Sequence, residues 1–344
     1  MGFCLQLSTK NQRIMTEKHM NSIEFETMYD TTSHLVAIQL HNSAINRRDD
    51  WICKGAYPNI QHQVTLGSDG CGTIVSIHKN SSVEEDIDLY VGQQVCICPS
   101  MNWGEREDIP HKNFHILGMP SDGTFSQNIV VPYQNVFPIP SHLRSLEAAA
   151  LPLAGLTAYR ALMTKGQLQK GNRVLVTGIG GGVAVFVLQF AVALGAEVYV
   201  TSSSQEKIDK AISMGAKGGA LYTSSNWTKS LPKHFDVVVD SAGGQDFGSL
   251  ISLIGMGGRI VFFGGTNGTW PPIKPQHLFF KQASILATTM GSPREFLAMC
   301  QLVEQYQIIP IVDSVFSLWD HHAAFERLLD RKRFGKIVFE HSKF

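Results

Sequence analysis

A glycine-rich stretch in the second half of the chain has the residue types and spacing of a phosphate-binding loop. The apolar run 174–176 and Thr177 lead into Gly178-Ile179-Gly180-Gly181-Gly182-Val183-Ala184, after which an apolar helix is expected. Gly178 permits a tight turn, while Gly181 and Gly182 place no Cβ between the backbone and a pyrophosphate. The free N–H groups at the start of the helix favour its negative charge. This context predicts dinucleotide binding in preference to a glycine turn that binds nothing.

The end of the following strand indicates which dinucleotide binds. A site for NADH would place Asp or Glu about 20 residues beyond the loop, where it holds the ribose 2′-hydroxyl. Here the run Thr201-Ser202-Ser203-Ser204 contains no carboxylate. The hydroxyls of Ser202 and Ser203 and the ammonium of Lys207 could hold a 2′-phosphate instead. We therefore predict NADPH, with NADH possible; the alternative is that the serines cap the next helix.

Strands and helices alternate around this loop. Apolar strands are expected at 173–177, 197–201, 235–240, 259–263 and 284–288, and helices at about 183–194, 205–214, 248–254 and 276–280. The run Val237-Val238-Val239 is apolar on both faces, which is typical of a strand covered by helices on both sides. The second half therefore has the pattern of an α/β fold with a doubly wound parallel sheet.

The first half has a different pattern. Strands are expected at 35–40, 72–77, 94–98 and 128–131, with no helical period between them, which favours an antiparallel barrel or sandwich. Helices are expected at 146–150 and 158–163, separated by Pro152 and Gly155. The tail is expected to form a helix from 294 to about 306, a strand at 311–316, a helix at 320–331 and a strand at 336–339. Periodicity alone leaves open where this tail packs.

Composition excludes several classes of partner. The 344 residues suggest two domains, and the 29 basic and 29 acidic side chains cancel. A neutral chain argues against nucleic acid or an anionic membrane as partner, so a small-molecule substrate is expected. The longest apolar stretch, 183–196, is too short to span a bilayer. Six scattered cysteines and no secretory signal favour reduced thiols and a cytoplasmic protein.

Seven segments resemble the medium-chain dehydrogenase/reductase superfamily, in its zinc-type alcohol dehydrogenase-like and quinone oxidoreductase-like branches. They occur in the family's order over nearly the whole chain, at 45–49, 55–58, 66–70, 122–125, 149–159, 178–184 and 334–338. The resemblance implies a GroES-like, mostly antiparallel β domain at 1–152 and a Rossmann domain at 153–290. It also implies that 291–344 return to the first domain, and that two copies form a homodimer through the edge of the Rossmann sheet, which strands 259–263 and 284–288 would suit.

The same resemblance reveals departures at the metal positions. Zinc-dependent relatives hold a catalytic zinc with a Cys, a His and a second Cys, and the matching residues here are Asn46, Ser68 and Leu153. Catalytic zinc needs three N, S or carboxylate ligands, and these residues supply none. The stretch 99–119 matches the structural zinc lobe of the relatives but contains no cysteine. No zinc is therefore predicted.

Two other pairs have ligand-like spacing. His111 and His115 are four residues apart but lie in an irregular loop without neighbouring cysteines. Cys96 and Cys98 alternate on a strand, which places both thiols on one face, where they are expected to be small buried residues. We predict no metal at either pair.

Without a metal, negative charge that develops on a substrate oxygen must meet hydrogen-bond donors. The catalytic candidates in the matched segments are Tyr57, Asn46 and Ser68, and we predict that Tyr57 is the side-chain hydrogen-bond donor or proton donor; the alternative is an aromatic wall of the substrate pocket. Asn46 could contact substrate or the nicotinamide ribose, or brace its loop. Asp49 and Asp69 could likewise brace their loops, paired with Arg47 or Arg48.

The family positions also imply further cofactor contacts. Thr157 is expected on the nicotinamide face, and Lys336 is expected to reach the cofactor. The remaining contacts come from the phosphate loop and from residues that end successive strands: Gly178, Gly180, Gly181, Gly182, Val183, Ser241, Gly264, Gly265, Thr266 and Thr289.

Together these features predict a zinc-independent, NADPH-dependent oxidoreductase. Hydride transfer needs the nicotinamide against the acceptor carbon, and an enolate is easier to stabilise than an alkoxide. Reduction of an activated C=C bond in an enone or quinone is favoured, and a reactive carbonyl is also possible. The alternatives are an alcohol dehydrogenase with a metal, and a nucleotide-binding sensor or structural protein without catalysis.

Overall fold

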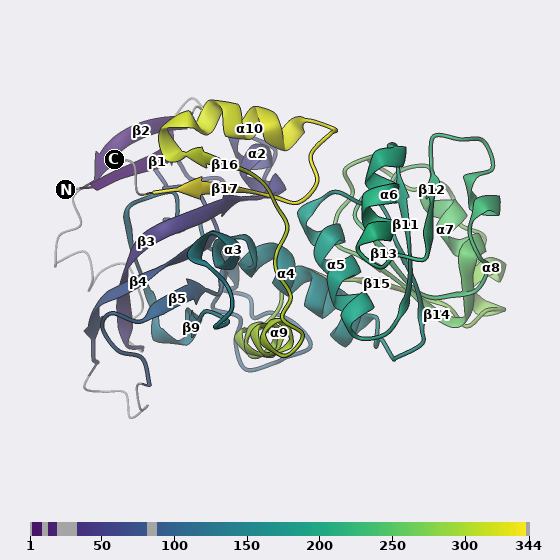
Figure 1. Ribbon diagram of the computed structural model, residues 1–344, viewed down its shortest axis with the longest axis horizontal. Coiled ribbons are helices and arrows are strands. Elements are labelled where there is room, and N and C mark those ends of the chain that lie inside the picture. Colours follow the sequence, from purple (N-terminus) through teal and green to yellow (C-terminus); the bar gives the residue numbers. More distant parts are fainter. Residues whose placement is uncertain (1, 9–12, 19–32, 81–87, 342–344) are drawn as a thin grey trace. The chain divides into compact units, whose positions relative to one another are not determined.

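The chain folds into two compact units. The computed structural model describes residues 2–8, 13–18, 33–80 and 88–341. Unit 1 contains Met1–Leu153 and Ser292–Phe344, and unit 2 contains Ala154–Gly291 (Figure 1). Among the described residues, no helix has both the length and the apolar character that crossing a membrane requires.

Unit 2 is built on a six-stranded, wholly parallel sheet. Its strand order is β12-β11-β10-β13-β14-β15, the doubly wound arrangement of a Rossmann domain. The strands are β10 (Arg173–Val176), β11 (Glu197–Ser202), β12 (Gly218–Leu221), β13 (Phe235–Asp240), β14 (Ile254–Phe262) and β15 (Ser284–Ala287). The helices are α4 (Pro152–Tyr159), α5 (Gly182–Ala193), α6 (Gln205–Ser213), α7 (Phe247–Leu253) and α8 (Gln276–Phe279). The predicted parallel sheet is confirmed.

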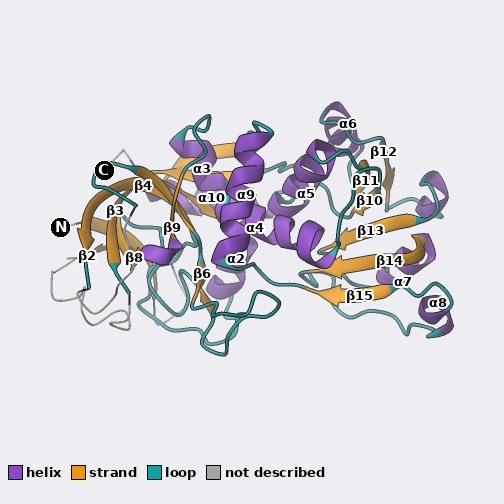
Figure 2. Ribbon diagram, turned by 90° about the horizontal axis from the view of Figure 1, so that it is seen from below, coloured by secondary structure: helices purple, strands orange, loops and turns teal. Residues whose placement is uncertain are grey.

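Apolar sequence explains the centre of this sheet. Val174, Leu175 and Val176 pair in register with the run Val237-Val238-Val239 of β13, and all six are buried. Figure 2 shows β13, β14 and β15 lying side by side. Phe247 of α7 stacks on Trp270 with ring centroids 3.7 Å apart, which closes one face of the core. Burial of these side chains on both sides of the strands is the main stabilisation of unit 2.

Three details of unit 2 differ from the sequence prediction. Strand β12 was not predicted, because Gly218 and Gly219 lack the side chains that favour strands. Helix α4 begins at Pro152 and includes Gly155, because proline is tolerated in the first turn and the helix continues into the π-helical segment Arg160–Lys165. Two strands were predicted to form the dimer contact at an edge of the sheet. Of these, β14 is internal and β15 lies at an edge.

Unit 1 contains a seven-stranded, mostly antiparallel sheet. Its order is β16-β17-β3-β4-β5-β9, β8 also pairs with β3, and only β16 and β17 are parallel to each other. These strands are β3 (Leu35–Ile45), β4 (Asp69–His78), β5 (Gln94–Ile97), β8 (Asn128–Pro132), β9 (Val136–Pro138), β16 (Val312–Ser317) and β17 (Lys336–Glu340). Two antiparallel two-stranded sheets accompany it, β1 (Gly2–Leu7) with β2 (Arg13–Lys18) and β6 (Ser100–Met101) with β7 (His115–Ile116). This is the GroES-like domain that the resemblance implied.

The tail joins unit 1 through β17, which pairs antiparallel with β3. The helices of this unit are α2 (Arg47–Cys53), α3 (Ser145–Ala150), α9 (Pro293–Gln305) and α10 (His321–Leu329). Helix α2 was missed, because seven residues are too few to show a helical period. A local sequence signal did exist, because Asn46 and Asp49 have the spacing of a helix cap. In the structure the Asp49 carboxylate accepts the Asn46 N–H at 2.8 Å and so caps the start of the helix.

The cysteines are part of the unit 1 core. All six are free thiols, and Cys71, Cys96 and Cys98 are buried, as expected for small apolar residues. Cys71 and Cys96 face each other across β4 and β5. Burial raises the pKa of Cys71 and of Cys98 to about 12, and that of the half-buried Cys53 to about 11. These thiols therefore stay protonated at neutral pH.

We expect the native protein to resist thiol reagents. At pH 8 a thiol with a pKa of 11 is ionised in roughly one molecule in a thousand, and the thiolate is the reactive form. With Ellman's reagent, fewer than one thiol per chain should react within minutes in the native state, and all six in guanidinium chloride. Rapid reaction of two or more native thiols would contradict the burial described here.

Candidate active site

The phosphate loop lies where the direction of strand winding reverses. It follows the carboxyl end of β10, whose neighbours are β11 on one side and β13 on the other. The chain runs from β10 outward to β12 and then crosses back to β13, so this is the switch point at which α/β sheets bind ligands. The Ile179 N–H donates to the Thr201 carbonyl at 2.8 Å, which ties the loop to β11.

The glycines of the loop have conformations and surroundings that suit a pyrophosphate. Gly178 and Gly180 have φ of +63° and +112°, where a side chain would be strained. Gly181 is the N-cap of α5 with φ −70°, so a side chain is sterically permitted there. A Cβ would meet nothing within 4 Å at Gly178, and only the Gly178 carbonyl oxygen at 3.9 Å when placed on Gly181. Open space in front of the first turn of α5 fits a phosphate group.

The serines at the carboxyl end of β11 and just beyond it lie at this same end of the sheet. Ser202 is buried and its Oγ accepts the Ser204 N–H at 3.1 Å, whereas Ser203 is exposed and Lys207 is half-buried. Ser204 occupies the N-cap position of α6 but its side chain makes no capping hydrogen bond. Capping by the side chain of Ser204 therefore does not account for the run of hydroxyls.

The other predicted cofactor residues are distributed along the carboxyl edge of the same sheet. Ser241 follows β13, Gly264, Gly265 and Thr266 follow β14, and Thr289 follows β15. The loop residues Gly264, Gly265, Thr266 and Thr289 are exposed. Thr157 on α4 is buried, with its Oγ1 3.8 Å from the Met290 sulfur. Val183 is the second residue of α5.

Sequence reasoning missed Asp240, the last residue of β13. Its carboxylate is buried, and it accepts hydrogen bonds from Thr177 Oγ1 at 2.5 Å and from the Gly243 N–H at 2.8 Å. Burial raises the pKa of Asp240 above its ordinary value. These contacts fix the residue before the phosphate loop and the turn after β13. A single acid that ends the run Val237-Val238-Val239 is the signal that could have identified it.

In unit 1, Asn46 connects a buried ion pair. The Lys336 ammonium lies 2.8 Å from Asp69 Oδ2, 2.6 Å from Asn46 Oδ1 and 3.0 Å from the Ile45 carbonyl oxygen. The Asn46 Nδ2 donates to Asp69 Oδ2 at 2.9 Å. Both polar atoms of the Asn46 amide are therefore engaged within unit 1. The same applies to the three N–H bonds of Lys336, which had been predicted to reach the cofactor.

A second buried cation, Arg48, contacts the two other catalytic candidates. It donates from Nε to Tyr57 Oη at 3.2 Å and from Nη1 to Ser68 Oγ at 2.6 Å. Ser68 is fully buried and donates to the Leu117 carbonyl oxygen at 2.8 Å. Tyr57 is half-buried, and its ring lies 4.9 Å from the Arg48 guanidinium carbon. The structure thus brings Tyr57 and Ser68 to one guanidinium.

Asp49 and Asp69 do not form the ion pairs with Arg47 or Arg48 that were predicted. Asp69 pairs with Lys336 instead of Arg47 or Arg48, and it also accepts the Leu153 N–H at 2.7 Å. Asp49 is fully buried, its Oδ1 has no hydrogen-bond partner among the described residues, and burial raises its pKa to about 6.

Comparison with known proteins supports the superfamily resemblance that the sequence motifs and the Rossmann sheet indicate. The family profile described as "Alcohol dehydrogenase GroES-like domain" matches residues 32–141, and the profile "Zinc-binding dehydrogenase" matches residues 182–305. The chain is 35% identical to a "Zinc-type alcohol dehydrogenase-like protein YogA" of Leptosphaeria maculans, over 89% of this chain and 90% of that protein. The chain belongs to the medium-chain dehydrogenase/reductase superfamily. Its relatives there include zinc-type alcohol dehydrogenase-like and quinone oxidoreductase-like proteins.

Two further relatives of this dehydrogenase/reductase show the range of the superfamily. An acryloyl-coenzyme A reductase of Metallosphaera sedula is 26% identical over 94% of this chain and 98% of its own length. The crystal structure of an NAD-dependent alcohol dehydrogenase is 28% identical, with a TM-score of 0.88, and covers 99% of this chain and all of its own. The superfamily membership makes the protein an oxidoreductase and implies a nicotinamide cofactor, which the open glycine loop fits.

The residues at the zinc positions of this dehydrogenase/reductase do not fit a zinc ion. Asn46 has both amide atoms engaged, Ser68 is bonded to a guanidinium, and Leu153 has no ligating group. Across the described residues, no three His, Cys, Asp or Glu side chains are grouped to hold a metal. His115 hydrogen-bonds Ser121, and burial together with the charge of Arg48 lowers its pKa.

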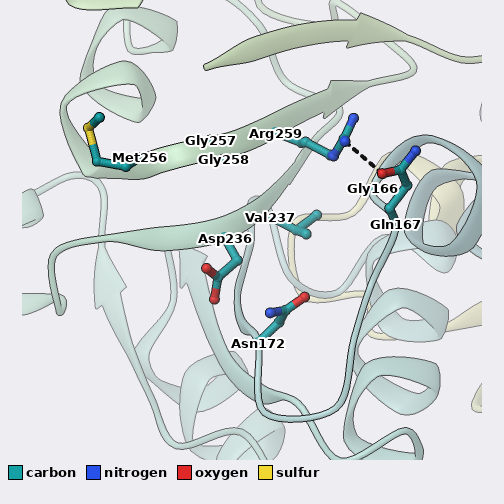
Figure 3. A pocket seen from close by; sticks show the side chains of 9 residues that line it. All are labelled: Gly166, Gln167, Asn172, Asp236, Val237, Met256, Gly257, Gly258 and Arg259. Carbon is teal, nitrogen blue, oxygen red and sulfur yellow. Dashed lines mark hydrogen bonds between the residues drawn. The ribbon is translucent and has the colours of Figure 1, made fainter. Parts of the chain in front are cut away.

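One further hollow of the dehydrogenase/reductase lies at the amino end of the strands in the unit 2 sheet, opposite to the phosphate loop (Figure 3). It has a volume of about 180 Å³ and its polar side chains include Gln167, Asn172, Asp236 and Arg259. Arg259 donates to Gln167 at 2.6 Å, and Asp236 accepts the Arg173 N–H at 2.7 Å. The hollow is smaller than usual ligand pockets and lies at the amino ends of β13 and β14, away from the ligand-binding edge.

Proposed function

We propose that this protein uses NADPH to reduce an activated C=C bond, as in an enone or quinone, or a reactive carbonyl, and that it does so without zinc. The observation that carries the proposal is the open space at Gly178 and Gly181, on the ligand-binding edge of the Rossmann sheet. The proposed contacts are those predicted from sequence in unit 2, with Ser203 and Lys207 near the 2′-phosphate.

The zinc-independent part of the proposal is supported by the chemistry of the side chains. Asn46, Ser68 and Leu153 replace two thiolates and an imidazole, and the ammonium of Lys336 lies 2.6 Å from Asn46 Oδ1. A second cation at this distance from a ligand position would oppose a divalent metal. Negative charge on the substrate oxygen would then be met by hydrogen-bond donors alone.

The preference for a C=C acceptor is supported by this limited set of donors. When bound, NADPH supplies the hydride, which adds to the carbon at the far end of the conjugated system. The remaining charge is delocalised as an enolate, which one phenol can stabilise by donating a hydrogen bond or a proton. Tyr57 is the proposed donor, while Asn46 and Ser68 are proposed to hold the residues around it. The acryloyl-coenzyme A reductase similarity favours the same acceptor class.

Metal analysis followed by an acceptor panel tests the proposal. The purified protein should contain no stoichiometric zinc and should oxidise NADPH with an enone or a quinone faster than with a simple aldehyde. Stoichiometric zinc with alcohol oxidation would establish the alcohol dehydrogenase alternative. Tight NADPH binding without turnover on any acceptor would establish the sensor alternative.

The proposed preference for NADPH leads to a prediction at Ser202. The variant Ser202→Asp can still accept the Ser204 N–H, so its fold should be retained, but its charge would oppose a 2′-phosphate. Two unit charges 4 Å apart repel by about 4 kcal/mol at an effective dielectric constant of 20, and solvent screening reduces this. Titration should show NADPH affinity at least about tenfold weaker and NADH affinity unchanged or improved.

The uncharged variant Ser202→Asn is the matched control for this experiment. It has nearly the same shape as the aspartate and should bind NADPH with an affinity near that of the wild type. An unchanged preference in Ser202→Asp would mean that the 2′-phosphate is recognised elsewhere.

We also propose that the protein is a cytoplasmic homodimer. Strand β15 is one of the two edge strands of the unit 2 sheet, and its side chains Ser284, Ile285 and Leu286 are only half-buried. An apolar edge strand with unpaired backbone groups favours pairing with a second copy. The six free thiols agree with a reducing compartment.

A further inference from the structure

Arg48 is a buried guanidinium whose hydrogen bonds all go to neutral oxygens. It is 8% exposed and donates to Tyr57, Ser68 and the Leu117 carbonyl oxygen, the last at 2.9 Å. Longer contacts of 3.4–3.5 Å reach the carbonyl oxygens of Met119 and Ile116. Among the described residues, no carboxylate forms a hydrogen bond or ion pair with this guanidinium. A buried guanidinium is costly unless its charge is compensated, and here the compensation comes from the electrostatic attraction of Asp49 and from neutral acceptors.

The direction of these hydrogen bonds distinguishes the three predicted donors. An arginine can only donate, so the Tyr57 oxygen must accept from Arg48 Nε. The phenol O–H then points away from the guanidinium and is the group left to donate. Ser68 differs, because its hydroxyl accepts a hydrogen bond from Arg48 and donates its own O–H to the Leu117 carbonyl oxygen. The Asn46 amide nitrogen donates to Asp69 Oδ2 at 2.9 Å and to the Ala44 carbonyl oxygen at 3.5 Å.

We propose that Arg48 is a positioning residue that fixes the Tyr57 phenol with its O–H directed toward the substrate oxygen. The positive charge beside the phenol oxygen polarises the O–H bond and makes Tyr57 a stronger donor to a developing enolate. The same guanidinium holds Ser68 and the backbone of residues 116–119, so the support for Tyr57 is rigid. This inference rests on the proposed reductase function and identifies the part of the chain that replaces the metal.

A double-mutant cycle in the full chain tests this coupling. Tyr57→Phe should lower kcat by about 10²-fold with little change in the Kd for NADPH. Arg48→Met should lower kcat to a similar extent, and Arg48→Lys, which retains the charge, should lower it less. Because Arg48 acts through Tyr57, the double variant Arg48→Met/Tyr57→Phe should be no slower than Tyr57→Phe alone. Losses that multiply would overturn the proposal.

A spectroscopic measurement tests the same contact independently of turnover. In protein labelled with ¹³C at tyrosine Cζ, the signal lost in Tyr57→Phe identifies Tyr57. This signal should move in Arg48→Met and remain in place in Arg47→Met, whose side chain is more exposed and lies 4.0 Å from Asp50. An unmoved signal in a folded Arg48 variant would overturn the proposal.

These measurements separate the proposal from the function on which it rests. If the wild type reduces no acceptor, the reductase function fails, while the tyrosine signal still decides whether Arg48 holds Tyr57. If Arg48→Met does not fold, Arg48→Lys carries both tests, because its single ammonium cannot reproduce the contacts from Nε and Nη1 to Tyr57 and Ser68.

Discussion

Gly181→Val is expected to abolish NADPH binding while the protein remains folded. The backbone of Gly181 has φ −70° and ψ 150°, a region that valine adopts readily, and the added Cβ would lie 3.9 Å from the nearest heavy atom. The branched side chain would instead occupy the open space before α5 and separate the pyrophosphate from the helix N–H groups. A loss of about 3 kcal/mol or more in binding, roughly a hundredfold in Kd, should follow.

Fluorescence titration with NADPH and thermal melting together test this expectation. Valine is a poor N-cap, so a loss of about 1 kcal/mol in stability is expected, which is small beside the loss in affinity. The matched control is Gly218→Ala on β12, where the added Cβ meets the Tyr199 ring at an ordinary 3.5 Å and NADPH affinity should not change. Wild-type affinity in Gly181→Val would show that the pyrophosphate does not lie against this loop.

The phosphate loop could be predicted because its chemistry is local. Seven consecutive residues determine the turn, the open space and the start of α5, and the strands on either side have strongly apolar sequences. The parallel sheet could be predicted for the same reason, because its central strands have strongly apolar sequences that alternate with helices. Strand β12 and helix α2 were missed for the opposite reason: four residues rich in glycine and seven residues of mixed polarity carry too little pattern to be seen.

The polar cluster of unit 1 could not be predicted because its contacts are long-range. Asp69 is 23 residues from Asn46 and 267 residues from Lys336, and these residues meet only because β3 pairs with both β4 and β17. From the sequence, Arg47 or Arg48 was expected to be the cation beside Asp69, although neither is adjacent to it along the chain. The register of β17 brings Lys336 there instead and leaves Arg48 to Tyr57 and Ser68.

Lys336→Met is expected to be the most destabilising single substitution in this cluster. The side chains of Lys336 and Asp69 are 4% and 0% exposed, so removing the ammonium would leave a buried carboxylate without its counter-ion. Breaking a buried pair in this way costs about 3–5 kcal/mol, or roughly 6–20 °C in melting temperature for a domain of this size. Calorimetry should show this loss in the transition of unit 1. The matched control is Lys54→Met, whose ammonium is half-exposed and pairs with Asp50 at 2.8 Å, and which should cost less than about 1 kcal/mol.

A double variant determines whether the uncompensated charge causes this loss. In Lys336→Met/Asp69→Asn no charge remains to be buried, while the amide oxygen can still accept the Leu153 N–H now bound by Asp69. If the buried charge of Asp69 is the main cause of the loss, the double variant should be more stable than Lys336→Met alone. This should hold even though the double variant has also lost the carboxylate as a hydrogen-bond acceptor. If the double variant is the less stable of the two, the hydrogen bonds through Asn46 contribute more to the stability of unit 1 than the pairing of charges does. Because Asp69 accepts hydrogen bonds from the Asn46 amide and from the Leu153 N–H, the second result would mean that its carboxylate serves chiefly to hold Asn46 between the end of β3 and the start of α2, the helix that carries Arg48.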